Sequence, residues 1–208
     1  MIHDISVVVR PGTPEWPGDV PFSCGWTCRL ADGASVNLSH IAGSPHVGTH
    51  ADAPVHVRDG WPASDELPLE PFLGPALLLD VSDTPSGELS LRADDPRLDG
   101  CERLLLRTGR SIASGGFPPA WPYLGASAAR DLTSRGVRLV GTDAPSVDQR
   151  ESKTLEVHRA LFGGGAYVLE NLDLHDLAPG TYDLIALPQR LGGLDAAPVR
   201  AALKDREP

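Results

Sequence analysis

One stretch of the chain decides its fold and carries most of its chemistry, and it reads Ser44-Pro45-His46-Val47-Gly48-Thr49-His50-Ala51-Asp52-Ala53-Pro54-Val55-His56. The polar side chains of interest in it are His46, His50, Asp52 and His56. They have the same parity, so in an extended segment they project from one face. The His-x3-His spacing would also suit one face of a helix, but the prolines and Gly48 disfavour a helix. We therefore expect a strand that breaks into a bent loop near Pro54.

This geometry predicts a metal site. Same-face neighbours lie roughly 6.5–7 Å apart along a strand, so His50 and Asp52 can converge on one centre. His56 lies too far along a straight strand, and it must either fold back as a separate catalytic group or take no part. Imidazole and carboxylate ligands without thiolates suit zinc, manganese or iron and leave the centre open to substrate or water. The alternative, ordinary polar loop residues, fits one histidine better than three with an aspartate.

Length, net charge and cysteine count limit the kind of protein that this sequence can encode. The 208 residues are enough for one domain with a full core, and we expect a single domain over residues 1–208. A formal net charge of −10 argues against nucleic-acid and anionic-membrane partners, which need a basic surface. No apolar run approaches the roughly 20 residues that span a bilayer. The N-terminus lacks the pattern of a secretory signal and the cysteines number three, so we expect a cytoplasmic protein.

Two of the cysteines form a Cys24-x3-Cys28 pair that could bind metal or act in redox chemistry. Cys24, Trp26 and Cys28 alternate on one face of an expected strand. We favour the simpler interpretation that these side chains pack as small apolar groups.

The remaining pattern is β-rich with a few short helices. Strands are expected at 4–9, 20–30, 35–41, 76–81, 103–107, 137–141, 166–169 and 182–187. Helices are expected at 125–134 and 155–161, a helix or strand at 199–203, and a loop at 82–99. One compact α/β domain is the economical interpretation.

His158 and Glu170 are twelve residues apart and separated by Gly163-Gly164-Gly165. A tight return there could bring both side chains to one place. Taken alone, the pair favours a surface ion pair or a capping role.

The histidine stretch resembles the signature of the cyclase-like metal-dependent hydrolases, in particular the bacterial-type kynurenine formamidases (arylformamidases). The other matching segments are Thr13-Pro14-x-Trp16-Pro17-Gly18-Asp19, Gly141-Thr142-Asp143-Ala144-Pro145-Ser146-Val147-Asp148, Ser152-Lys153-Thr154-Leu155, Glu170-Asn171-Leu172 and Ala186-Leu187-Pro188. They follow the family order over nearly the whole chain, and the combination with Trp16 is what favours the formamidases.

The resemblance implies a swivelling β/β/α fold, usually a homodimer, with two zinc ions per subunit. One metal would be bound by His46, His50 and Asp52. Asp52 would bridge to the second metal, which His158 and Glu170 would complete. His56 would be the general acid/base, and Trp16 would contact the substrate.

The implied reaction is hydrolysis of N-formyl-L-kynurenine to L-kynurenine and formate in tryptophan degradation. Two metals would activate water and polarise the carbonyl, and His56 would move the proton. A related amide or lactam hydrolase resembling isatin hydrolase would share every ligand, and manganese could then replace zinc. A non-catalytic metal- or ligand-binding module remains the alternative outside enzymes. No Gly-x-Ser-x-Gly elbow supports a serine nucleophile.

Overall fold

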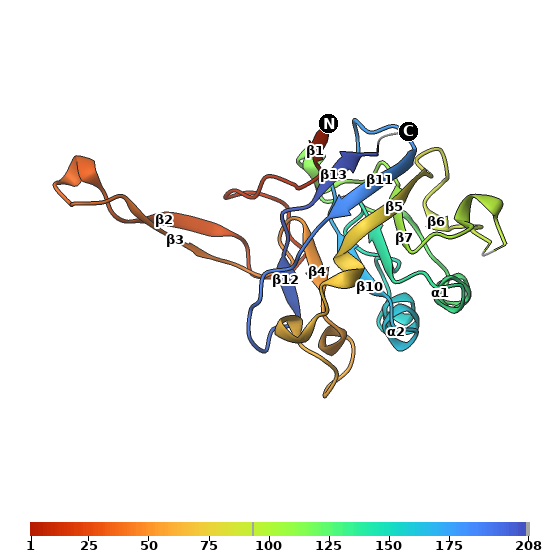
Figure 1. Cartoon of the computed structure of the whole chain (residues 1–208). Helices are drawn as coiled ribbons and strands as arrows, with labels where there is room; N and C mark the ends of the chain where they lie inside the picture. Colours follow the sequence, from red (N-terminus) through yellow and green to blue (C-terminus); the bar gives the residue numbers. More distant parts are fainter. Residues whose placement is uncertain (93, 207–208) are drawn as a thin grey trace.

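A large mixed sheet organises the molecule. The computed structural model describes residues 1–92 and 94–206, and within them one sheet of nine strands has the order β1-β13-β11-β5-β7-β9-β10-β4-β12 (Figure 1). Its strands are β1 (Ile2–Asp4), β4 (His50–Asp52), β5 (Leu73–Asp80), β7 (Arg103–Arg107), β9 (Leu139–Thr142), β10 (Tyr167–Glu170), β11 (Gly180–Ile185), β12 (Ala196–Pro198) and β13 (Ala202–Asp205). The central strands β5, β7, β9 and β10 are parallel, and the neighbouring pairs on both sides are antiparallel.

Two α-helices in the described part of the chain, α1 (Ala126–Ser134) and α2 (Glu156–Gly163), cover one face of this sheet (Figure 1). Strand β7 shows why: Leu104 and Leu106 belong to the apolar cluster that contains the buried faces of both helices, while Leu105 between them belongs to the cluster on the opposite face. This alternation is the two-residue period of a strand buried on both sides.

On the face of the sheet opposite the helices, the strands curve around a second apolar cluster. Ala51 of β4 and Leu203 of β13 lie far apart in the strand order, yet both are fully buried in that one cluster. The result is two β layers and one helical layer. The predicted α/β class, dominated by strands with a few short helices, is confirmed.

Short 3-10 turns connect these elements. They are η1 (Leu30–Asp32), η2 (Pro54–His56), η3 (Ser64–Glu66), η4 (Glu70–Phe72), η5 (Pro96–Leu98) and η6 (Ile112–Ser114). The region predicted as a loop at 82–99 also contains β6 (Gly87–Glu88), which pairs with β8 (Pro122–Tyr123); residue 93 lies outside the described residues. No helix in the described ranges combines the length and apolarity that a bilayer crossing needs.

The hairpin of β2 (Ser23–Cys28) and β3 (Leu38–Ala42) extends away from the body of the molecule, and we call it the arm (Figure 1). Trp26 is 54% exposed and Ile41 73% exposed on it. The prediction that Cys24 packs as a small apolar group is wrong within this single chain, because the arm stands clear of the core and Cys24 is exposed.

The first predicted strand, 4–9, is also wrong in its bounds. Pairing with β13 ends at Asp4. Beyond it the backbone N–H of Ile5 donates to Ala201 O, and that of Val7 donates to the Thr49 hydroxyl 2.9 Å away. The segment is therefore held by separate contacts, one of them to a side chain of the histidine stretch, instead of by a continuous ladder.

Candidate metal centre

Strand β4 carries two of the predicted ligands into the middle of the sheet. His50 and Asp52 share one face of the strand, and Ala51 between them faces the core. Strands β10 and β12 pair with β4 on its two sides, which sets Glu170 directly opposite His50. Because both edges of β4 are hydrogen-bonded, the two side chains are fixed in position before any ligand binds.

His46 reaches the same place from a turn, so the expected strand does not extend back to it. Gly48 makes this turn with φ of +78°, and a Cβ there would lie 2.3 Å from a methyl carbon of Val9. Only glycine combines that conformation with that closeness. The turn brings Nδ1 of His46 to 3.1 Å from both Nε2 of His50 and Oδ1 of Asp52.

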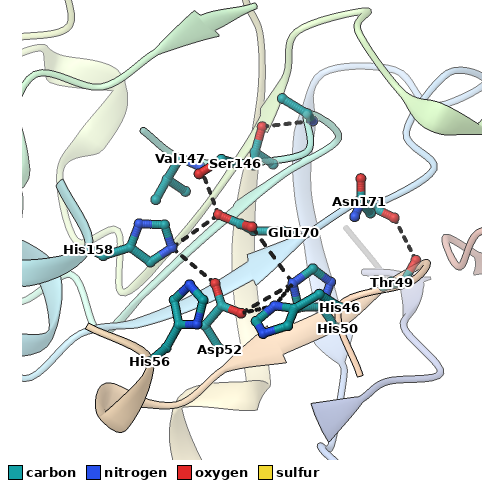
Figure 2. A network of polar contacts seen from close by, with 12 residues as sticks. His46, Thr49, His50, Asp52, His56, Ser146, Val147, His158, Glu170 and Asn171 are labelled. Atoms are coloured by element: carbon teal, nitrogen blue, oxygen red, sulfur yellow. Dashed lines mark hydrogen bonds and ion pairs between the residues drawn. The ribbon is translucent and has the colours of Figure 1, made fainter. Parts of the chain in front are cut away.

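A second trio of side chains lies beside the first (Figure 2). His158 comes from α2 and Glu170 from the end of β10. Nε2 of His158 lies 3.0 Å from Oδ2 of Asp52 and 3.2 Å from Oε1 of Glu170. Asp52 therefore offers one oxygen to each trio.

The donor set fits metal ions. Oδ1 of Asp52 is buried and, in the described chain, has no hydrogen-bond partner, although Nδ1 of His46 and Nε2 of His50 lie 3.1 and 3.2 Å away. Bonds of about 2.0–2.2 Å to a tetrahedral metal would hold its ligand atoms roughly 3.3–3.6 Å apart. Three such atoms this close, without hydrogen-bond geometry between the carboxylate and the rings, fit ligands directed at a common centre.

The outer nitrogens of two rings are engaged elsewhere. Nδ1 of His50 lies 2.9 Å from the carbonyl oxygen of Gly48, and Nδ1 of His158 lies 2.6 Å from Oδ2 of Asp148. Both oxygens can only accept, so each Nδ1 carries a proton, and Nε2 is the nitrogen that each ring would offer to a metal.

The electrostatics of the two trios favour added positive charge. Burial lowers the pKa of His46, but the neighbouring carboxylates of Asp195 and Asp52 outweigh it and raise that pKa to about 10. Burial likewise opposes the charged form of Asp52, but His50 and His158 hold its pKa well below the usual range. The carboxylates of Asp52 and Asp195 remain charged. Without a metal ion, their negative charge is balanced by extra protons on the neighbouring histidines.

His56 folds back beside the trios instead of following the strand. The 3-10 turn that begins at Pro54 brings its ring centroid to 4.6 Å from that of His46 and 5.9 Å from that of His158. Its Nδ1 lies 3.1 Å from Oδ2 of Asp195. His56 is close to both trios but belongs to neither, as Figure 2 shows.

A cavity of about 760 Å³ opens over this centre. Trp16 lines it and contacts Phe117 and Trp121 edge to face, with ring centroids 5.5 and 6.0 Å apart. Other lining residues include His46, His50, His56, Lys153, His158, Glu170, Asn171 and Asp195. The cavity thus joins an aromatic wall to the polar centre, and it contains the two residues predicted outside the ligand set, His56 and Trp16.

Comparisons with known proteins agree with this arrangement. The family model "Cyclase", described as "Putative cyclase", matches residues 3–149. A kynurenine formamidase of Salinibacter ruber is 44% identical over 207 residues, covering 97% of this chain and 96% of that protein. The chain belongs to the cyclase family.

Solved structures extend the similarity of this cyclase-family chain. One, described as a potential metal-dependent hydrolase with cyclase activity, superposes with a TM-score of 0.81 at 27% identity and covers 100% of this chain and 99% of its own. Isatin hydrolase A from Labrenzia aggregata, bound to benzyl benzoate, superposes with a TM-score of 0.79 at 26% identity, covering 98% and 93%. Family, fold and the potential metal-binding cluster therefore agree.

Two acidic residues of this cyclase-family site were not identified from sequence. Asp148 ends a segment that matched the family, but nothing in its spacing indicated a contact with His158. Asp195 follows Gly192-Gly193-Leu194 in a loop without any recognised motif. Asp148 lies 10 residues from His158 in the sequence, and Asp195 lies 149 residues from His46. Contacts between residues this far apart can be seen only in the folded structure.

Proposed function

We propose that this protein hydrolyses N-formyl-L-kynurenine to L-kynurenine and formate. The observation that carries the proposal is the pair of trios sharing Asp52, with His56 beside them, in a chain 44% identical to a kynurenine formamidase along nearly its full length. A purely structural metal site would need neither a neighbouring histidine nor a cavity.

In this proposal, His46, His50 and Asp52 would hold one zinc ion, and Asp52, His158 and Glu170 would hold the other. When bound, such a pair supplies Lewis acidity and an activated water at neutral pH. The chain's contribution is a rigid arrangement: His50, Asp52 and Glu170 lie on paired strands, and α2 holds His158.

His56 handles the protons. Its imidazole takes a proton from the attacking water and delivers it to the departing arylamine nitrogen, which is a poor leaving group unless protonated. The ring is part of the cavity wall and is free of both trios, so it can do this without leaving a metal.

Trp16 binds the arylamine ring. It is 38% exposed and contributes an aromatic surface to the cavity, with its position supported by Phe117 and Trp121. Stacking on such a surface orients the substrate so that its formyl group lies over the polar centre.

The test is hydrolysis of N-formyl-L-kynurenine, followed by absorbance, before and after treatment with a chelator. We expect turnover that chelation removes and zinc restores. A fully metallated protein without turnover would contradict the proposed substrate.

The second candidate is a lactam hydrolase, favoured by the structural similarity to isatin hydrolase A. Isatin is assayed in parallel, with zinc and with manganese, because nitrogen and oxygen ligands accept both metals. Faster hydrolysis of isatin would select this candidate, and full metal loading with no hydrolysis of either compound would favour a non-catalytic module.

The quaternary and cellular setting is part of the same proposal. We infer a homodimer formed through the arm, since its exposed apolar side chains, Trp26 and Ile41 among them, lie outside the core of the single chain. A single domain over the chain is supported by ligands drawn from both of its halves. Unpaired cysteines suit a cytoplasmic enzyme.

A further inference from the structure

Asp195 connects a predicted metal ligand to the predicted acid/base. It lies immediately before β12, and its backbone carbonyl accepts the N–H of Ala53 at 2.8 Å. This bond fixes the loop against the segment between Asp52 and η2. The side chain then extends to the two histidines on either side of that segment, with Oδ2 3.0 Å from Nε2 of His46 and 3.1 Å from Nδ1 of His56.

The two contacts determine where the ring protons lie. A charged carboxylate oxygen accepts hydrogen bonds and donates none, so both facing nitrogens carry hydrogen. His46 then carries a hydrogen on Nε2, which leaves Nδ1, 3.1 Å from both Nε2 of His50 and Oδ1 of Asp52, as the nitrogen that it would offer to a metal. His56 is protonated at Nδ1, which leaves its Nε2 as the basic nitrogen.

We propose that Asp195 is a positioning residue that sets the tautomers of His46 and His56 through a single carboxylate oxygen. One effect is on metal binding, because a carboxylate behind a ligating imidazole fixes its orientation and increases its basicity. The other is on proton transfer, because only the neutral tautomer with a free Nε2 can act as a base at that nitrogen. The second effect rests on the proposed hydrolysis.

The same three residues could instead hold a cation, since their ligand atoms lie within 4.8 Å of one another. A cation there would occupy a nitrogen lone pair of His56. The two arrangements differ in metal stoichiometry and in the protonation of His56, so both quantities are measured.

The experiment compares Asp195→Asn with Asp65→Asn in the full-length, zinc-loaded protein. Asp65 accepts the backbone N–H of Gly193 at 2.8 Å, so it contacts the same loop without contacting a histidine. Three quantities are measured: zinc affinity and stoichiometry, kcat and KM, and the ring nitrogen shifts of the histidines by NMR.

For Asp195→Asn we expect kcat about 10- to 100-fold lower with little change in KM, together with weaker zinc binding. The His56 signals should move from a single Nδ1–H form towards a mixture of tautomers. Asp65→Asn should resemble the wild type, and Asp195→Glu should restore part of the loss. In a His56→Ala background, Asp195→Asn should weaken zinc binding without a further fall in kcat.

Two results would overturn the proposal. One is an unchanged His56 tautomer together with unchanged zinc affinity in Asp195→Asn. The other is a third zinc equivalent in the wild type that this variant loses. Zinc affinity and the NMR signals do not depend on the substrate, so they test Asp195 even if N-formyl-L-kynurenine proves not to be hydrolysed.

Discussion

Asp148 contacts His158 twice, through Oδ2 to the ring Nδ1 at 2.6 Å and through the same oxygen to the backbone N–H at 3.1 Å. Its other oxygen accepts the N–H of Val157, so this one carboxylate also binds the first turn of α2. The orientation of the ring and the start of the helix are therefore coupled.

We predict that Asp148→Asn weakens zinc binding at the trio of Asp52, His158 and Glu170 about 10- to 100-fold. An uncharged amide also binds the helix N-terminus less well, so unfolding free energy should fall by about 1 kcal/mol. Zinc titration and urea denaturation measure the two effects. Asp131→Asn, on the exposed side of α1, is the control; equal zinc affinity in both variants would contradict the prediction.

His56→Ala should lower kcat about 10²- to 10⁴-fold, the usual range for a lost general acid or base, while the zinc content stays full. Metal analysis and steady-state kinetics are run on the same sample. The control is His175→Ala. This variant removes an exposed histidine whose partners, Asp173 and Asp176, lie outside the cavity lining. Retained turnover in His56→Ala would contradict the proposed role of His56 as the general acid/base.

Trp16→Ala should raise KM about 2- to 10-fold, which corresponds to the loss of one aromatic contact of about 0.5–1.5 kcal/mol. Trp16→Phe keeps an aromatic face and should lie close to the wild type. An unchanged KM in the alanine variant would show that the arylamine ring binds elsewhere.

Zinc binding should release protons. Without metal, burial lowers the pKa of His46, but the carboxylates of Asp195 and Asp52 raise it to about 10. Burial also lowers the pKa of His158, and the carboxylates around that ring raise it well above its usual value. Both rings are then protonated near neutral pH and must lose protons to bind metal. Zinc affinity should therefore increase as pH rises and fall as pH drops. Calorimetry in two buffers of different ionisation enthalpy counts the protons; a count of zero would contradict the expected protonation.

Ile41→Lys should convert a dimer into a monomer, because it puts a charge on the apolar surface of the arm. Sedimentation velocity measures the change. Leu69→Lys, at a 55% exposed position away from the arm, should leave the dimer intact. A monomeric wild type would contradict the arm interface.

Sequence was a reliable guide where a pattern is local. The run Arg103–Arg107 is a strand with the predicted bounds, because four of its five side chains are buried and it ends at turn residues. Helix α1 begins one residue after the predicted position and ends at the predicted residue. In contrast, β12 was missed, since three residues that end in a proline form a strand only through pairing with β4.

The candidate site also contains some features that follow from local sequence patterns and others that depend on contacts between distant residues. The residues that resemble the family signature do meet in space, and their assigned roles stay predictions. Strand parity explained His50 and Asp52 but not His46, which depends on the left-handed Gly48 and its packing against Val9. Asp195 could not be predicted, because it meets His46 across 149 positions.

The double pairing of β4 also bears on how the protein folds. His50 and Asp52 can face Glu170 only after β4 has joined β10, and His158 approaches Asp52 across 106 positions. A register error of one residue would turn both β4 ligands to the opposite face. The full ligand set therefore does not exist until the two halves of the chain have paired correctly. A metal ion that needs all of these ligands would therefore stabilise only the correctly registered sheet, because it would bind the folded chain and not the unfolded one.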